Sequence, residues 1–137
     1  MDPDFSAIDT VLENGNLDGY LLDAASEFSN QRYLSGFDAG DPFLSLYVDG
    51  RIALLVSNLE YSRAKRESRA DVVRRMSDYD FMETVESLGR AAARSTVVAA
   101  FLSELDVAGV ACNPRFPLLK ADSLREEGVT VEVDTED

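Results

Sequence analysis

The sequence predicts one α/β domain of three layers, in which a mixed sheet of about six strands lies between helices on both faces. Helical and strand patterns alternate along almost the whole chain, and no internal repeat or long linker interrupts them. Within residues 43–56 apolar side chains occupy both alternating sets of positions, so both faces of these strands must be covered. A chain of 137 residues suits one domain, because it buries roughly two thirds of the surface that its unfolded form exposes.

The first predicted elements are an amphipathic helix and a buried strand. Near the start, apolar residues recur at helical spacing, a capping aspartate precedes them and a glycine follows them. These residues are Phe5, Ile8, Val11 and Leu12, with Asp4 as the cap and Gly15 at the carboxyl end. The apolar run from Gly19 to Leu22 lies between Asp18 and Asp23, which predicts a strand buried in the sheet.

The segment NQRYLSGF at residues 30–37 is too short and too mixed for an ordinary helix or strand. Ser26 can cap a short helix that includes Arg32, and Gly36 can end this helix in a left-handed conformation. The turn-rich residues 38–42 follow, and we expect them to be exposed where the sheet begins again.

Residues 43–56 predict a β-hairpin. Two apolar runs flank Asp49 and Gly50, a pair that tolerates positive φ at both centres of a type I′ turn. The stretch Ser57 to Glu60 follows directly and has the pattern of a capping box. We therefore expect the second strand of the hairpin to pass straight into a helix.

The second half of the chain continues the alternation of strands and helices. In chain order, the patterns predict a short strand at 71–73, two helices containing residues 81–88 and 97–105 that separate near Gly89, a strand at 107–112, a helix between Pro117 and Gly128, and a last strand at 129–133.

Negative charge dominates the composition. The chain has 26 Asp and Glu against 13 Lys and Arg, a net charge of -13 at pH 7, and its lysines are Lys65 and Lys120 alone. Such a surface repels nucleic acid and anionic membranes, so we expect neither as a partner. An acid excess with few lysines is typical of proteins adapted to molar salt, which predicts a halophilic source. The alternative is an ordinary acidic protein from a GC-rich genome.

Molar salt should stabilise a domain of this charge. At about 1 M ionic strength the Debye length shrinks to about 3 Å, which screens the mutual repulsion of surface carboxylates. We expect calorimetry to give a melting temperature several degrees higher in molar KCl than in dilute buffer. A melting temperature that is indifferent to KCl would contradict the halophilic interpretation.

Cysteine content and hydropathy predict the compartment. Cys112 is the single cysteine, which excludes an internal disulfide and a cysteine-rich metal site and fits a reducing compartment. We expect it to be buried as a small apolar residue. No apolar run approaches the roughly 20 residues of a membrane span, and the acidic start MDPDF lacks the basic region of a signal peptide. The sequence therefore predicts a soluble, cytoplasmic protein.

Nothing in the sequence argues for a self-sufficient enzyme. The chain has no histidine, so the usual imidazole base and ligand are missing, and its glycines fit no phosphate-binding frame. Asp18, Asp23 and Asp49 lie near predicted strand ends, where nucleases gather carboxylates around two cations. Asp18 better suits the entry into a strand and Asp49 the hairpin turn, but a carboxylate-dependent nuclease stays open as an alternative.

Nearly half of the positive charge lies in one run between residues 63 and 75. Its members are Arg63, Lys65, Arg66, Arg69, Arg74 and Arg75. One interpretation is a docking patch for an acidic neighbour. We favour the other, a solvated helix face with pairs such as Arg63 to Glu67.

Several segments stand in an order that is known from one protein family. A strand GYLLDA is followed by a short helix leading into NQRYLSGF, a loop, a hairpin FLSLYVDGRIALLVS and a helix beginning NLEYSRAKRES. This order resembles the amino-terminal domain of the creatinase, prolidase and Xaa-Pro aminopeptidase family. In that family a Tyr-Leu-Thr-Gly-Phe type motif stands where this chain has Tyr33 to Phe37, and Ser35 is a mild departure from it. The later segment VAGVACNPRFPLLKADSLREEGVTVEV is similar to the end of the same domain.

The resemblance implies a creatinase/prolidase amino-terminal fold with a ribonuclease H-like motif, formed by residues 1–137 as one domain. It also implies a carboxyl-terminal catalytic domain of pita-bread fold in the complete protein. That domain holds two divalent ions, Mn, Co or Zn, through two aspartates, a histidine and two glutamates, and it cleaves the bond before proline. A chain that has no histidine and ends VEVDTED after a strand is expected to be the first domain, cut at the linker and inactive by itself, with no cofactor of its own.

The resemblance implies a role for this domain in the dimer and in walling the active-site cleft, often that of the partner subunit. By position, the candidates for lining the cleft are Arg32, Tyr33, Phe37, Asp38 and Asp41. An apolar ring suits a proline-containing substrate, and a carboxylate can hold a free amino terminus by a charge-assisted hydrogen bond. The alternative is that Tyr33 and Phe37 are core anchors that fix the loop.

The expected partners follow from this role: the chain's own catalytic domain, a second subunit in a homodimer, and a proline-containing peptide. A function of a different class stays open. The chain could be a free-standing binding or assembly module of the same fold, without peptidase activity, that pairs through its sheet edge or its basic helix.

Overall fold

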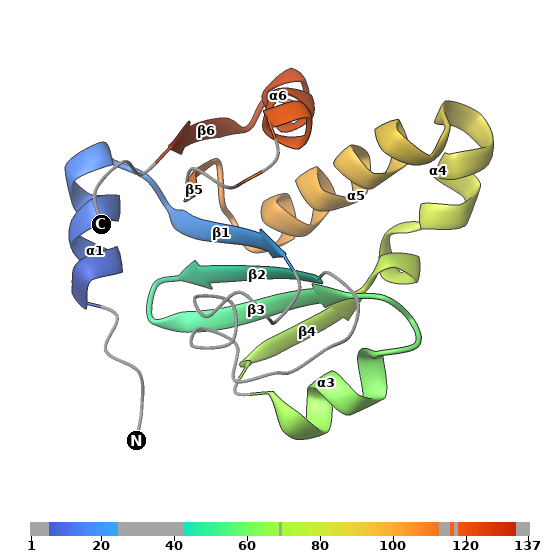
Figure 1. The fold of residues 1–137 in the computed structure, drawn as a ribbon, viewed down its shortest axis with the longest axis horizontal. Coiled ribbons are helices and arrows are strands. Elements are labelled where there is room, and N and C mark those ends of the chain that lie inside the picture. The colour runs from blue at the N-terminus through green and yellow to red at the C-terminus, as the bar shows by residue number, and fades with distance from the viewer. Residues whose placement is uncertain (1–5, 25–42, 69, 113–115, 117, 134–137) are drawn as a thin grey trace.

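The structure is a computed structural model that describes residues 6–24, 43–68, 70–112, 116 and 118–133 (Figure 1). The helices are α1 (Ser6–Gly15), α3 (Tyr61–Glu67), α4 (Phe81–Leu88), α5 (Arg90–Glu104) and α6 (Leu118–Glu126), with a 3-10 helix, η1 (Met76–Tyr79). The strands are β1 (Gly19–Ala24), β2 (Phe43–Val48), β3 (Arg51–Val56), β4 (Val72–Arg75), β5 (Gly109–Cys112) and β6 (Thr130–Val133).

The six strands form one mixed sheet in the order β4-β3-β2-β1-β5-β6. The pairs β1–β2 and β2–β3 are antiparallel, and the pairs β1–β5, β3–β4 and β5–β6 are parallel. A tight turn joins the antiparallel strands β2 and β3, whereas helices connect the parallel neighbours β3–β4 and β5–β6, as parallel pairing requires. The predicted α/β class and the mixed six-stranded sheet are confirmed.

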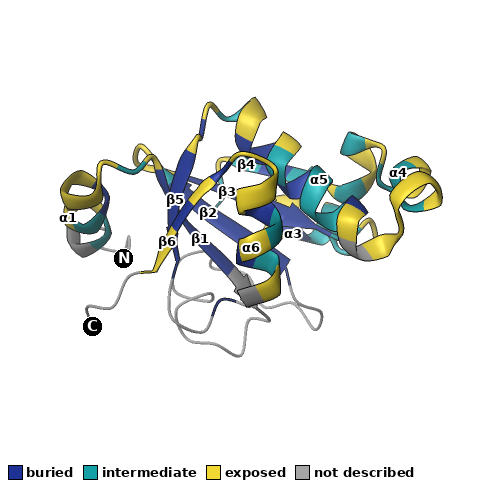
Figure 2. Ribbon diagram, turned by 90° about the horizontal axis from the view of Figure 1, so that it is seen from above, coloured by how far each residue is buried: buried dark blue, intermediate teal, exposed yellow. Residues whose placement is uncertain are grey.

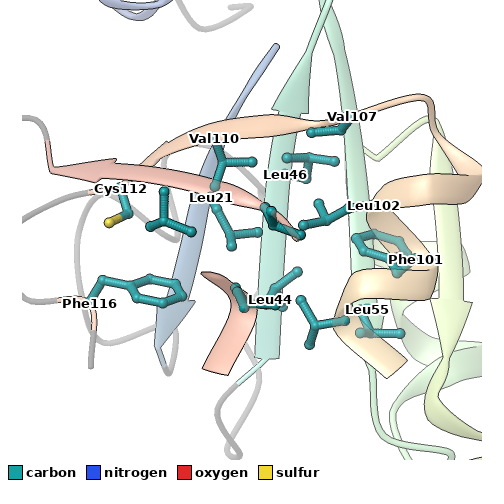
Figure 3. Close-up of a cluster of buried hydrophobic side chains, with 14 of the residues drawn as sticks. Leu21, Leu44, Leu46, Leu55, Phe101, Leu102, Val107, Val110, Cys112 and Phe116 are labelled. Atoms are coloured by element: carbon teal, nitrogen blue, oxygen red, sulfur yellow. The ribbon is translucent and has the colours of Figure 1, made fainter. Parts of the chain in front are cut away.

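One face of the sheet packs against α5 and α6. Leu46 of β2 and Val110 of β5 lie in one cluster with Phe101 and Leu102 of α5, and all four side chains are fully buried (Figure 3). Burial of each such side chain contributes roughly 1.5–3 kcal/mol. Cys112 lies in the same cluster, as predicted, and burial raises the pKa of its thiol. This cysteine is therefore an unreactive part of the core.

The other face packs against α1 and α3. Tyr20 and Leu54 from the sheet lie in one buried cluster with Leu12 of α1 and Ala64 of α3. Successive residues of a strand point to opposite faces, so burial of both faces makes the central strands continuous apolar runs. Figure 2 shows most of β2 and β3 as buried, together with the part of β1 that is not grey. Helices on both faces, predicted from the hairpin sequence, are thus confirmed.

The turn between β2 and β3 has the predicted conformation. Asp49 has φ 50° and Gly50 has φ 78°, the double left-handed backbone of a type I′ turn. A β carbon at Gly50 would meet no atom within 4 Å, so glycine is favoured there by backbone conformation and not by lack of space. Val48 and Arg51 pair directly across the turn, which fixes the register of the hairpin.

The predicted capping box after β3 is wrong. Helix α3 begins at Tyr61, and its cap residue Glu60 makes no side-chain capping hydrogen bond. The Glu60 N–H donates to the backbone carbonyl of Ser57 at 3.1 Å, and the Glu60 carboxylate pairs with Arg63 at 3.0 Å. A turn at residues 58–60 therefore separates strand from helix. The Ser57 hydroxyl has no hydrogen-bond partner among the described residues.

Helix α1 ends one residue later than the sequence predicts. Gly15 is its last residue, and the left-handed residue is Asn16, with φ 55°. Asparagine tolerates this conformation, and the Leu17 N–H then donates to the Leu12 carbonyl at 2.9 Å to close the helix. At Gly15 a β carbon would lie 3.0 Å from Leu17 Cδ1, so close packing also favours glycine there.

The remaining predicted elements are present with shifted ends. Strand β5 begins at Gly109, not at 107, and α5 begins at Arg90, directly after Gly89. The predicted short helix with Ser26 as its cap, like the Asp4 cap and Pro117, lies outside the described residues. No helix in the described ranges is long and apolar enough to cross a membrane.

Candidate functional site

The residues predicted to line a cleft lie outside the described part of the chain; they are Arg32, Tyr33, Phe37, Asp38 and Asp41. The structure does place the two strand ends between which they occur. Strand β1 ends at Ala24 and β2 begins at Phe43, and these two residues are direct partners in the sheet. The intervening segment therefore starts and finishes at one edge of the sheet.

Strands β3 and β4 end at the same edge. Val56 and Arg75, the last residues of these parallel strands, are direct partners, and the hairpin places the end of β3 beside the start of β2. We call this side of the sheet, marked by Ala24, Phe43, Val56 and Arg75, the carboxyl edge. Ligands of open α/β sheets bind outside the carboxyl ends of parallel strands. The carboxyl edge is therefore the candidate functional site.

Hydrogen bonds join the turns that extend from the carboxyl edge. The Ser77 hydroxyl donates to Asn58 Oδ1 at 3.1 Å, which links η1 to the turn at 58–60. The backbone N–H and the Nε of Arg75 donate to the Asp78 carboxylate at 3.0 and 3.1 Å. Burial alone would raise the pKa of Asp78, but the bonds from Arg75 outweigh it and lower the pKa. These contacts fix the rim formed by η1 and the turn.

Part of the basic run is paired inside the domain. Arg63 contacts Glu60 at 3.0 Å and Glu67 at 3.2 Å, and the second contact is the predicted i,i+4 pair. Lys65 lies over the ring of Tyr61, 5.3 Å from its centroid. The predicted ion pair on the helix face is therefore confirmed, and the docking patch stays an alternative. Exposed pairs of this kind contribute about 1 kcal/mol or less.

Glu104 joins β4, η1 and the end of α5. Its Oε1 accepts hydrogen bonds from Arg74 Nε at 2.9 Å and from the Tyr79 hydroxyl at 2.8 Å. The Tyr79 ring meets Phe101 edge to face, with centroids 6.3 Å apart. Burial and the bond to Glu104 raise the pKa of Tyr79, and the bond to Glu104 raises the pKa of Arg74. Both donors keep their protons at neutral pH, so the cluster fastens the fold and is not a proton-transfer site.

A groove of about 720 Å³ lies at the opposite edge of the sheet, between the hairpin turn and the starts of β1 and β5. The charged side chains that line it are Asp9, Glu13, Asp18, Asp49, Asp106 and Arg51. Several of these carboxylates have structural roles. Asp49 and Asp106 hold left-handed turn positions, with φ 50° and 60°. The acidity of the groove thus follows in part from the turns that build it.

Asp18 is engaged by the backbone of β5. Its Oδ2 accepts hydrogen bonds from the N–H groups of Ala108 at 2.8 Å and Gly109 at 3.1 Å. Asp71 does the same for β3, because its Oδ2 accepts from the N–H of Ile52 at 2.9 Å. Asp18 Oδ2 therefore has a structural role at the entry into β1, as the sequence predicts for this residue. Within the described ranges, no three His, Cys, Asp or Glu side chains are grouped so that they could hold a metal ion.

Tyr47 connects this groove to the core. Its buried hydroxyl donates to Asp9 Oδ1 at 2.6 Å, which ties α1 to β2. Burial, the hydrogen bond to Asp9 and the negative charge of Asp9 raise the pKa of Tyr47 to about 12. The folded protein therefore holds this proton in a pH range where the unfolded chain, with an ordinary pKa of about 10, releases it.

The contribution of the Tyr47 proton to stability should be lost at alkaline pH. Because the folded pKa is the higher one, the stability that Tyr47 contributes is complete below pH 10 and is lost as the pH rises to about 12, by roughly 2–3 kcal/mol. Between pH 10 and 12, we expect the free energy of unfolding measured in urea to fall by that much less in Tyr47→Phe than in the unsubstituted chain. Equal losses in the two proteins would show that this phenol does not titrate with unfolding.

Residues 6–131, nearly the whole chain, match the family described as the creatinase/prolidase N-terminal domain. The chain belongs to this family. The resemblance seen in the order of its segments is confirmed at the level of the family. No curated protein sequence gives a match.

Solved structures share the fold at low sequence identity. Prolidase from Pyrococcus furiosus superposes with a TM-score of 0.65 over 96% of this chain at 14% identity, and prolidase from Pyrococcus horikoshii with 0.63 over 92% at 17%. A proline dipeptidase from Streptococcus pneumoniae superposes with a TM-score of 0.61 over 96% of this chain at 22% sequence identity. The matched region covers 34%, 30% and 90% of these three chains. The present chain thus spans about a third of the length of each Pyrococcus prolidase.

Sequence analysis missed two residues that fasten the sheet to its surroundings, Asp71 and Glu104. The strand pattern predicts Asp71 as part of a strand. Its position directly before an apolar run, which Asp18 shares, could have indicated that its carboxylate accepts a hydrogen bond from a neighbouring strand. Glu104 has no such signal. Its partners Arg74 and Tyr79 are distant in sequence and meet it only through the packing of α5 on the sheet.

Proposed function

We propose that this chain is the noncatalytic amino-terminal domain of a proline-specific metallopeptidase, an Xaa-Pro dipeptidase or aminopeptidase. The observation that supports the proposal is the family match over residues 6–131. The similar solved structures described as prolidases and a proline dipeptidase agree with it. The chain has no histidine, so any catalytic set that uses imidazole comes from another part of the complete protein.

In this proposal the carboxyl edge supplies one wall of the active-site cleft. Ala24 and Phe43 hold both ends of the segment that contains the motif, and Ser77 and Asn58 join the neighbouring turns into one rim. A wall of this kind must keep its shape when substrate binds, because small displacements of positioning groups are costly for catalysis. The paired strand ends meet that requirement.

The residues proposed to contact substrate are those of the motif and the loop that follows it. Tyr33 and Phe37 would form the apolar surface against the proline ring, with Arg32 beside them. Asp38 or Asp41 would bind the free amino terminus of the peptide by a charge-assisted hydrogen bond.

The partners in the proposal are the catalytic domain of the same protein and a second subunit in a cytoplasmic homodimer. The two divalent ions, Mn, Co or Zn, would be held by that catalytic domain and not by residues of this chain. The net charge of -13 supports a halophilic source for the assembly.

Substrate kinetics of the complete enzyme test the proposal. The reading frame beyond Asp137 should encode an ordered Asp, Asp, His, Glu, Glu set. We expect Asp38→Asn or Asp41→Asn in that enzyme to raise KM for an Xaa-Pro dipeptide about tenfold with little change in kcat, because binding loses a charge-assisted hydrogen bond. The matched control is Asp122→Asn, whose carboxylate pairs with Arg125 on the exposed face of α6.

The control variant should leave both constants unchanged. Unchanged KM in both loop variants would contradict the assignment of these carboxylates to the amino terminus of the substrate. Absence of the metal-ligand set from the complete reading frame would contradict the peptidase assignment itself.

A further inference from the structure

Helix α4 is weakly tied to the core. None of its residues is buried, and Figure 2 shows it at one end of the molecule, beyond the sheet. Phe81 at its first position packs against the core cluster covered by α5 and α6. Beyond Phe81, the apolar residues of α4 belong to neither cluster, and Met82 and Leu88 are 61% and 57% exposed. Hydrophobic burial therefore holds only the start of this helix.

The length and junctions of α4 also favour local opening. A helix of 8 residues is not stable by itself in water, so α4 depends on its neighbours, η1 and α5. Left-handed residues bracket it, with φ 56° at Asp80 and 86° at Gly89. A β carbon at Gly89 would meet no atom within 4 Å, so this glycine serves the change of direction alone. Gly89 lies directly after α4, at the end of an element, where hinges absorb movement.

A carboxylate of α5 binds the base of α4, where Met76 and Tyr79 also pack against the core cluster. Glu104 Oε1 accepts hydrogen bonds from Tyr79, the last residue of η1, at 2.8 Å and from Arg74 of β4 at 2.9 Å. The side chains of Arg74 and Glu104 are 38% and 43% exposed, so water competes for these bonds. Farther along, α5 is anchored independently, because Ala93 and Val97 are fully buried.

We propose that η1 and α4, residues 76–88, form a hinged flap that opens while the sheet stays folded, and that Glu104 fastens this flap closed. Opening breaks the bonds to Glu104 and the bond from Ser77 to Asn58, and it exposes the inner sides of Met76, Tyr79 and Phe81, while α5 remains on the sheet. The flap starts directly after Arg75, at the carboxyl edge, and only in the closed flap does the bond from Ser77 to Asn58 complete the rim of the candidate site. The inference concerns this chain alone, and its test does not depend on the peptidase assignment.

Native-state hydrogen exchange tests the flap. The informative amides are those from Thr84 to Leu88, because the Thr84 N–H already donates to the Asp80 carbonyl at 3.0 Å within the helix. We expect them to exchange at least about tenfold faster than the amides of β2 and β3. In Glu104→Ala they should exchange about tenfold faster again, with β2 and β3 unchanged.

Two further variants separate the fastening from general destabilisation. Tyr79→Phe keeps the ring and should speed exchange of the flap less than Glu104→Ala, and in the Glu104→Ala background it should add nothing, because the shared acceptor is gone. Glu67→Ala is the matched control, since it removes an exposed carboxylate that pairs with Arg63 at 3.2 Å within α3. It should leave the flap unchanged.

Two results would overturn the inference. One is flap amides that exchange as slowly as those of β2 and β3 in the unsubstituted chain. The other is a Glu104→Ala variant in which flap and strands accelerate equally. Either result would show that α4 opens only when the whole domain unfolds.

Discussion

Replacing Leu46 with Ala is expected to lower the free energy of unfolding by about 2–5 kcal/mol. Leu46 is fully buried in β2, a central strand that pairs with β1 on one side and β3 on the other. The neighbouring backbone is held by both ladders and can relax little, so truncation leaves a cavity. Because domains of this size are stable by about 5–15 kcal/mol, the loss is a large fraction of the total. Urea unfolding followed by circular dichroism measures it.

Leu59→Ala is the matched control for this substitution. Leu59 lies in the turn after β3 and is 92% exposed, so the same chemical change should alter stability by no more than about 0.5 kcal/mol. Equal losses in the two variants would contradict the placement of the core between the sheet and α5.

Asp18→Ala is expected to cost about 1–3 kcal/mol. The substitution leaves the N–H groups of Ala108 and Gly109 without the carboxylate oxygen that binds them, and it loosens the pairing of β1 with β5. Asp18→Asn should cost less, because its amide oxygen can still accept. Thermal and urea unfolding at neutral pH and constant salt measure the difference.

Removing any negative charge from a chain of net charge -13 also relieves repulsion, so the control must remove one as well. Asp122→Ala does so on α6, where the carboxylate is 56% exposed and pairs with Arg125. We expect this control to stay within about 0.5 kcal/mol of the unsubstituted chain. If Asp18→Ala and Asp122→Ala have the same stability, the hydrogen bonds of Asp18 contribute nothing measurable.

The order of the elements could be predicted because local signals and tertiary structure agree. The double left-handed turn at Asp49 and Gly50 is favoured by these two residues alone. The apolar runs of β1 to β3 predicted burial on both faces, and helices are present on both. Family resemblance added the identity of the domain, which periodicity could not supply.

Two predicted helix ends were wrong because nearby residues compete for the same role. The sequence from Ser57 to Glu60 satisfies the capping-box pattern, but Arg63 binds the Glu60 carboxylate and the helix starts later. At the end of α1, Gly15 and Asn16 can both adopt the left-handed conformation. The hydrogen bond from the Leu17 N–H to the Leu12 carbonyl closes the helix with Asn16 as the left-handed residue. Neither choice depends on hydrophobic periodicity, so pattern analysis cannot make it.

The strands that flank the motif could be predicted, but the contacts around their ends could not. The motif lies between β1 and the hairpin in sequence, which is enough to assign it to the edge where those strands meet. The bond between Ser77 and Asn58 and the cluster around Glu104 depend on residues brought together by the chain path through β4 and α5. Such contacts leave no periodic trace in the sequence.

We propose that this chain supports catalysis housed elsewhere and performs none itself. The most direct test is an assay of Xaa-Pro dipeptide hydrolysis by the purified 137-residue chain in the presence of Mn²⁺, Co²⁺ or Zn²⁺. We predict no turnover above that of the metal ion alone. Sustained, saturable release of proline by the pure chain would contradict the claim.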